Sequence, residues 1–232
     1  MKHRATTAYP FTDTIEYIII ADGPADLHLR VPSWAEAESS ITTDFTLSTP
    51  LQSDRKTGLH KVVVGAGSAK TKYDIHSSIR IDTRSDDTIA VYERALLYAI
   101  EVKHTTTSTK PKAFRSPHDF FADCYAPDKV RDWEYKSAST WALAIDPLTL
   151  RFHMPSLVPR PTFTRDANVG YMSAQGCEID WPPIEDGVPG PPPPAAVRRC
   201  VGNRLEVKFT PYGYAKLHIA EIPVIRLRQD DE

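Results

Sequence analysis

Short runs in which apolar and polar residues alternate are the feature that most limits how this chain can fold. In residues 27–31 every second residue is aliphatic, and the residues between are charged or polar. Successive side chains of a β-strand point to opposite faces, so this pattern predicts a half-buried strand. Shorter or weaker strand candidates lie at 41–47, 59–64, 71–75, 79–81, 132–135 and 141–145. Strands this short and evenly spaced predict an antiparallel sandwich rather than βαβ units.

The clearest alternation is at residues 205–209, near the carboxyl end of the chain. Leu205, Val207 and Phe209 share one face of the predicted strand. Glu206 and Lys208 share the other. We therefore expect the three apolar side chains in a core and the two charged ones in water.

Three further segments carry predictions about pairing and burial. A turn at 211–213 follows the strand predicted at 205–209, and 214–219 is expected to run back beside that strand as its hairpin partner. In the second half of residues 12–21, isoleucines stand at both odd and even positions. Side chains on both faces of this strand are therefore expected to be buried. Residues 87–102 are dominated by aliphatic and aromatic residues without a helical stripe, so a strand with a bend is expected.

Charge and hydrophobicity exclude two classes of partner. The formal net charge is −2, the pI is about 6.4, and lysines and arginines are scattered. This distribution has no basic patch for nucleic acid or for an anionic membrane. No segment reaches the ~18 apolar residues of a membrane span, and the N-terminus lacks the apolar region of a secretory signal. Localisation stays open.

Two stretches look like reactive motifs but fail on their spacing. VVVGAGSAKT, residues 62–71, resembles a phosphate-binding loop, yet Ala69 stands where glycine must precede the lysine. Short β-type runs follow it where a helix is required, so we expect a hairpin turn. His118-Asp119 has no second ligand at metal-binding spacing nearby.

The three cysteines, Cys124, Cys177 and Cys200, show no C-x-x-C spacing and no paired histidines. The sequence therefore predicts no metal site and no cofactor. Cys177 and Cys200 flank a Pro-rich loop at 187–194, which is expected to be extended and solvated. In an oxidising compartment these two cysteines can close the loop as a disulfide, provided that their Cα atoms lie within ~7 Å.

Tryptophans are the candidate binding residues. Trp34, Trp133 and Trp181 can offer flat faces on which a sugar stacks, although core packing is the more common fate of such rings. A carbohydrate-binding role requires them to be exposed along one surface. An unrecognised active site would instead need titratable groups such as His118, Asp119 and Asp123 to converge in a pocket.

Nine runs of sequence, in order, carry a resemblance to a known family. They are YPF (9–11), LHLRVPSWA (27–35), KTGLHKV (56–62), DDTIAVY (86–92), ALLYAIEV (95–102), YAP (125–127), RDWEY (131–135), STWALAIDP (139–147) and FTPYGYAKLHIAEIPV (209–224). The series resembles the C-terminal part of glycoside hydrolase family 127, the non-reducing-end β-L-arabinofuranosidase-like proteins, in a fungal form. The family usually has Gly-Pro where this chain has Arg94-Ala95, and Trp-Asn-Tyr where it has Trp141-Ala142-Leu143.

The resemblance implies an all-β chain of two tandem antiparallel β-sandwich, jelly-roll-like modules, residues 1–86 and 87–232. In the family a helical barrel precedes these modules and carries the zinc-bound cysteine nucleophile and the acid–base glutamate. The resemblance begins after that barrel, so it places no catalytic residue on this chain. The implied function is non-catalytic, with a helical-barrel hydrolase domain as the partner. A carbohydrate-binding module acting alone and a truncated product without independent function are the alternatives.

Overall fold

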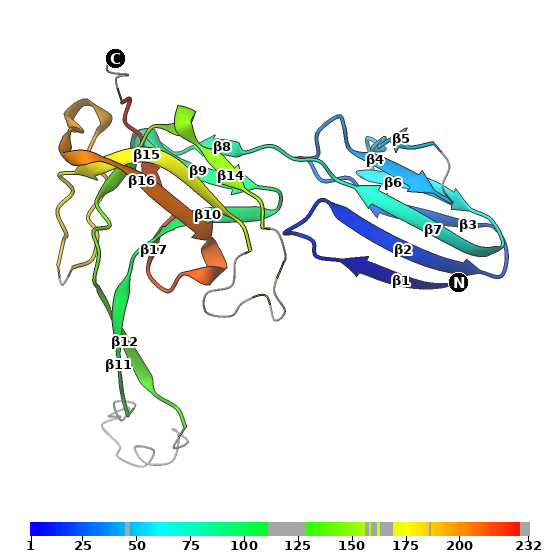
Figure 1. The fold of residues 1–232 in the computed structure, drawn as a ribbon, viewed down its shortest axis with the longest axis horizontal. Coiled ribbons are helices and arrows are strands. Elements are labelled where there is room, and N and C mark those ends of the chain that lie inside the picture. The colour runs from blue at the N-terminus through cyan, green and yellow to red at the C-terminus, as the bar shows by residue number, and fades with distance from the viewer. Residues whose placement is uncertain are drawn as a thin grey trace.

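The computed structural model describes residues 1–44, 47–110, 129–155, 158, 162, 169–185 and 187–227. Figure 1 shows two β bodies side by side, with a two-stranded arm leaving the second. All strand ladders in the described residues are antiparallel, and the only helical turns there are short 3-10 segments. These are η1 (Ser85–Asp87), η3 (Pro147–Thr149), η4 (Ala195–Val197) and η5 (Tyr212–Tyr214). The predicted all-β fold is confirmed.

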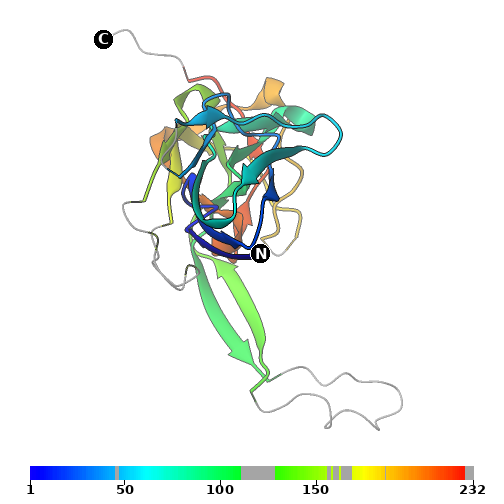
Figure 2. The ribbon, with the colours of Figure 1, turned by 90° about the vertical axis from the view of Figure 1, so that its right-hand side faces the viewer.

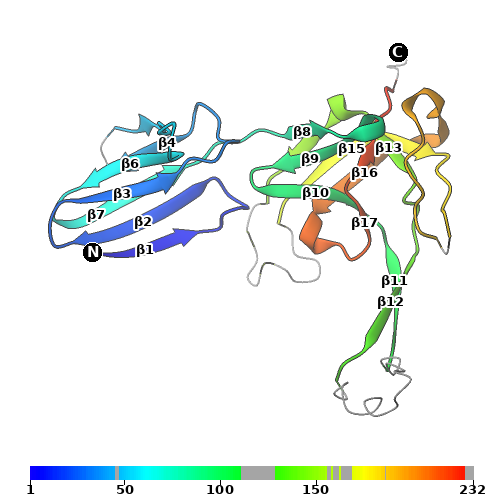
Figure 3. The same cartoon turned by 180° about the vertical axis from the view of Figure 1, so that it is seen from behind.

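The first body consists of two sheets packed face to face. The five-stranded sheet has the order β1 (Lys2–Thr7), β2 (Thr14–Ala21), β7 (Gly67–Asp74), β4 (Ser40–Thr43) and β5 (Thr49–Pro50). The second sheet pairs β3 (Ala25–Arg30) with β6 (Leu59–Val64), and Figure 3 shows it from behind. Tyr73 lies in the core between them, where burial raises its pKa to about 12. Its protonated hydroxyl donates a 2.6 Å hydrogen bond to the carbonyl of Arg30, which ties β7 to the opposite sheet.

The second body is one sheet rolled around its main core, and a smaller apolar cluster that includes Cys177 and Trp181 lies beside it. Its order is β13 (Leu143–Ile145), β15 (Tyr171–Ile179), β16 (Cys200–Pro211), β10 (Leu96–Glu101), β9 (Thr88–Glu93) and β18 (Ile222–Pro223). Three short strands add to it: β14 (Arg151–His153) on β15, β17 (His218–Ile219) on β10 and β8 (Arg80–Thr83) on β9. A bridge between Ile145 and Val224 joins the two ends of the sheet. The core inside the roll includes Val91, Met172 and Phe209, all fully buried.

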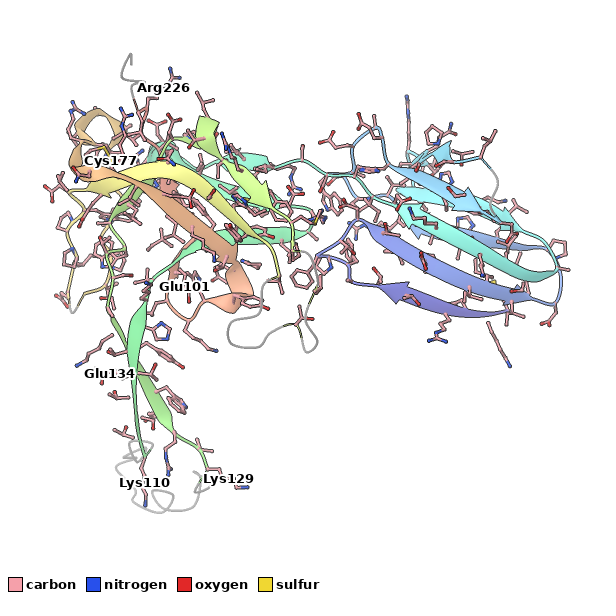
Figure 4. All side chains as sticks on the ribbon, in the orientation of Figure 1. Glu101, Lys110, Lys129, Glu134, Cys177 and Arg226 are labelled. Atoms are coloured by element: carbon pink, nitrogen blue, oxygen red, sulfur yellow. A yellow bond between two sulfur atoms is a disulfide. The ribbon has the colours of Figure 1, made fainter. Side chains whose placement is uncertain are left out.

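The arm is a hairpin of β11 (His104–Thr109) and β12 (Asp132–Ser137). Residues 111–128, between the two strands of the arm, lie outside the described part. Figure 2 shows the arm extending well away from the rest of the molecule. Its described side chains are exposed except those of His104 and Tyr135, whose rings meet edge to face near the base. In Figure 4 Glu134 lies partway along the arm, and Lys110 and Lys129 mark its far end.

Two predictions about which strand side chains are buried are wrong. Leu205 is 36% exposed although it shares a face with buried Val207 and Phe209, because the core inside the roll does not extend to its end of β16. Ile18 and Ile20 are 40% and 52% exposed, not buried on both faces. They lie on the outer side of the five-stranded sheet, and no second layer from the described residues covers them.

Two predicted hairpins are also wrong. The chain after β16 returns as β17 beside β10, because β15 and β10 already occupy both edges of β16. Similarly, β6 and β7 do not pair with each other, since Gly65 and Ala66 carry the chain from one sheet of the first body to the other. The segment 87–102 does form a hairpin, β9 and β10, with its bend at Arg94 and Ala95.

Candidate functional site

A buried ion cluster joins the first body to the second. The turn between β9 and β10 places Arg94 with only 3% of its surface exposed. Its Nε lies 2.5 Å from Oδ1 of Asp13, which precedes β2 in the first body. The backbone carbonyl of Asp13 accepts from Ile75 just past β7, so both partners are anchored to sheets. The cluster therefore links the two bodies through a charge pair largely withdrawn from water.

The surroundings of Arg94 complete this junction. The Glu93 carboxylate lies 3.7 Å from the guanidinium and accepts a 2.7 Å hydrogen bond from Ser77. The ring of Phe152 lies 5.2 Å from the guanidinium carbon, a cation–π distance. Arg94 has a φ of 54°, a left-handed conformation that favours glycine. The glycine usual in the resembling family fits this turn, and the arginine here adds the charge that meets Asp13.

The three tryptophans that are candidates for sugar stacking lie in different parts of the molecule. Trp34 is half-buried beside the core of the first body, and its ring stacks on Tyr9 at 6.4 Å. Trp133 is 59% exposed on the arm. Trp181 is only 6% exposed, and its Nε1 donates to the carbonyl of Gly190, so its faces pack in the second body. Trp181 therefore has the more common fate of such rings, packed in a core, and its hydrogen bond anchors the Pro-rich loop.

A pocket of about 800 Å³ opens where the arm leaves the second body. Its lining residues come from the arm, the Pro-rich loop and β17, which only the fold brings together, so no local sequence pattern points to this pocket. Half-buried Trp141 lines the pocket and meets Trp181 edge to face at 5.2 Å. His218 lines it as well and packs against Tyr212 at 4.1 Å. Glu134 and Lys136 of the arm also line the pocket, and their carboxylate and ammonium lie 3.4 Å apart, so these two charges balance.

A second pocket, of about 780 Å³, lies beside buried Arg198. The guanidinium donates to backbone carbonyls of Asp87, Val224 and Pro193 and also contacts the carbonyl of Asp86. Burial lowers the pKa of Arg198. These hydrogen bonds satisfy the guanidinium of Arg198 and hold the Pro-rich loop close to the ends of β9 and β18.

The cysteines and acidic residues are placed as follows. Cys177 and Cys200 form a disulfide with Cα atoms 5.5 Å apart, which confirms the predicted pairing. Cys124 and the group His118, Asp119 and Asp123 lie outside the described residues, so a site there stays a prediction. Within the described ranges, no group of three or more His, Cys, Asp or Glu side chains is arranged to hold a metal ion. None of the helical segments in that part of the chain is long and apolar enough to cross a membrane.

Comparisons with known proteins identify similar folds only among solved structures. No protein-family model matches the chain, and no curated protein does. The chain is similar to a GH127 β-L-arabinofuranosidase from Geobacillus stearothermophilus T6, with a TM-score of 0.56 and 13% identity over 96% of this chain and 30% of that one. A protein described as a glycoside hydrolase has a TM-score of 0.53 and 11% identity, over 96% of this chain and 32% of that one. A further GH127 β-arabinofuranosidase has a TM-score of 0.54 and 12% identity, over 96% of this chain and 31% of that one. The chain thus shares its fold with about a third of each of these proteins.

Proposed function

We propose that this chain is a non-catalytic β region of a glycoside-hydrolase-like protein and that it packs against and supports a hydrolase body. The observation that carries the proposal is the uneven coverage of the similar structures. Each matches nearly the whole of this chain, 96%, with only 30–32% of its own length. The remaining two-thirds of those enzymes is the kind of body that this chain would support.

The division into two modules, residues 1–86 and 87–232, belongs to this proposal. The sheets support two modules, since the described strands up to Asp74 pair only with one another. Pairing of β8 with β9 favours a boundary just before Arg80 rather than at residue 86. The Asp13–Arg94 pair would then hold the modules in one orientation for a partner that contacts both.

The cysteine chemistry supports a non-catalytic role. The resembling family uses a zinc-activated thiolate, and a thiolate must be free to attack. Cys177 and Cys200 are bonded to each other, which removes two of the three sulfurs. We expect the purified chain, incubated with an aryl β-L-arabinofuranoside and zinc in non-reducing buffer, to show no turnover above a blank. Turnover that disappears in Cys124→Ser or Asp119→Asn would contradict the proposal.

The supporting role has a direct test. The two-thirds of the Geobacillus enzyme that this chain does not match would be co-expressed with the chain. We expect a higher soluble yield and a higher melting temperature of that body, because binding to the folded state stabilises it. A heat-unfolded sample of the chain, added to the purified body, is the control. Equal yield and melting temperature with and without the chain would count against the proposal.

Carbohydrate binding is a second candidate function, favoured by the pocket at the base of the arm. Its wall combines a fixed indole, Trp141, with the hydrogen-bonding groups of His218 and Glu134. Neutral sugars bind to such mixtures of apolar face and oriented polar groups. Titration with arabino-oligosaccharides, followed by tryptophan fluorescence, tests it, with Trp141→Ala as the pocket variant and Trp133→Ala as the matched exposed one. A response lost only in Trp141→Ala would support the pocket, and the absence of any response would exclude it.

A further inference from the structure

The pocket beside Arg198 has an aliphatic wall that separate segments of the second body build together. Ile81 belongs to β8, Leu148 to η3, and Ile225 to the segment that follows β18. Leu148 is 88% exposed although it lines a hollow of about 780 Å³. A volume of this order is usual for small-molecule sites, and aliphatic surface left in water gains free energy when a ligand covers it.

A buried carboxylate outside the pocket fixes the shape of this wall. Asp146 is buried and does not itself line the pocket. Its Oδ1 accepts a 3.1 Å hydrogen bond from the backbone N–H of Leu148, and its Oδ2 accepts a 3.3 Å bond from the N–H of Leu227. The segments on the two sides of the pocket are therefore held in place before a ligand arrives, which lowers the entropic cost of binding.

Three arginines, Arg198, Arg199 and Arg226, line the same pocket. None of their guanidinium groups forms an ion pair with a carboxylate in the part of the chain that the structure describes. Backbone carbonyls accept the hydrogen bonds of Arg198. Arg199 donates a 2.6 Å bond to the carbonyl of Arg198. Arg226 is exposed, and its donors are available to a ligand.

The carboxylates around the pocket are fewer than its cations or are already engaged. Among the acidic residues that the structure describes, only Asp87 lines the pocket. Asp82 lies 3.9 Å from Arg84, and both oxygens of Asp146 accept backbone N–H groups. Asp86 acts on the buried guanidinium from outside the pocket. The lining itself thus carries three cations and one anion beside its aliphatic wall.

We infer that this pocket binds a small monocarboxylate with an apolar body, of the aryl-alkanoic or medium-chain alkanoic class. The carboxylate accepts charge-assisted hydrogen bonds from Arg226 and Arg199, which are stronger than bonds between neutral groups. The wall at Ile81 and Leu148 covers the apolar body. An inorganic anion would leave that wall in water, and a neutral apolar molecule would leave the guanidinium groups without an acceptor. The inference does not depend on the supporting function, because the pocket lies in the second body alone.

Isothermal titration calorimetry of the whole chain tests this assignment. The ligand is phenylbutyrate, and phenylbutyramide is the neutral probe of the same shape. The charge variant is Arg226→Gln, and its control is Arg151→Gln, which removes an exposed cation of β14 that does not line the pocket. Leu148→Asn tests the aliphatic wall at a residue whose exposure makes the substitution safe for folding.

We expect phenylbutyrate to bind about tenfold more tightly than phenylbutyramide, and Arg226→Gln to remove most of that difference, since a hydrogen bond to a charged group is worth this much. Arg151→Gln should leave the affinity within about twofold, because exposed charges outside the pocket are screened. Leu148→Asn should weaken both probes by about threefold or more through loss of apolar contact.

Equal affinity for the acid and the amide would contradict the inference, and so would equal losses in Arg226→Gln and Arg151→Gln. No binding of phenylbutyrate to the wild-type chain would overturn it outright. Inorganic phosphate that binds as tightly as phenylbutyrate would reduce the pocket to a plain anion site. Binding that appears only after deletion of residues 228–232 would mean that the chain's own carboxylates, Asp230, Asp231 and Glu232, take the place of a ligand.

Discussion

The ion pair between Arg94 and Asp13 is expected to contribute measurably to the free energy of unfolding. A charge that is buried beside its partner becomes costly when the partner is removed, since no water replaces the lost carboxylate. We expect Asp13→Ala to lower the free energy of unfolding by about 1–3 kcal/mol, below the range for a fully buried pair because Asp13 is 26% exposed. Urea unfolding followed by fluorescence measures it. Asp26→Ala, which breaks an exposed 2.7 Å pair with Lys61, should cost less than about 1 kcal/mol. Equal losses in both variants would mean that the junction pair is an ordinary surface pair.

Asp74 makes the stability of the first body depend on pH. Burial opposes its charge, but hydrogen bonds from Lys72 and Thr14 outweigh burial, and the pKa of Asp74 is lowered. A carboxylate with a lowered folded-state pKa stabilises the fold above its unfolded value of ~3.9, and this contribution is lost as pH falls through the folded value. We expect melting temperature to fall as pH drops below ~4, and Asp74→Asn to reduce that slope. A variant with the wild-type pH dependence would contradict the assignment.

At the scale of elements, β16 separates a core face from a solvent face. Phe209 is fully buried and Lys208 is exposed over the ring of Tyr171. We expect Phe209→Ala to destabilise by roughly 3–5 kcal/mol and Lys208→Ala by less than ~1 kcal/mol in denaturant unfolding. Leu205→Ala should fall between them, since Leu205 is 36% exposed. Similar small losses from all three would show that β16 does not border the core.

The disulfide between β15 and β16 closes a loop with a sequence separation of 23 residues. In the loop-entropy treatment, a closure of that length restricts the unfolded chain by about 3 kcal/mol. We expect Cys200→Ser to lower the midpoint of urea unfolding in non-reducing buffer. The wild type should fall to the same midpoint once a reductant is present. No difference between oxidised and reduced wild type would show that the bond adds nothing to stability.

At the scale of the whole molecule, stability is distributed unevenly. A two-stranded hairpin without a packed face is marginal in water, and the arm of β11 and β12 has exposed side chains along most of its length. The strands β15 and β16 border the buried core of the second body. We expect arm amides to exchange with deuterium at least a hundredfold faster than those of β15, because local opening of the arm breaks few buried contacts. Slow exchange in the arm of the isolated chain would contradict this and would point to a contact made by the arm itself.

The sequence alone determined which segments are strands wherever alternation was strict. Residues 27–30 of the predicted 27–31 lie in β3, and 205–209 lie in β16 as predicted, because period-two alternation reports a local property, the two faces of one strand. It missed β15, which is buried on both faces for much of its length and therefore does not alternate. Gly176 in that strand is required by a contact that no local pattern contains: a Cβ there would lie 2.4 Å from the carbonyl oxygen of Ala144.

Pairing and exposure were decided only by the tertiary structure. Whether 214–219 returns beside β16 or β10 depends on which strand edges are already occupied, and these are set by segments distant in the chain. The exposure of Ile18 and Ile20 likewise depends on what lies outside the sheet, and their own residue types do not encode that. The Asp13–Arg94 pair joins residues 81 positions apart. Local periodicity cannot locate such a contact, because it arises only when two sheets come together.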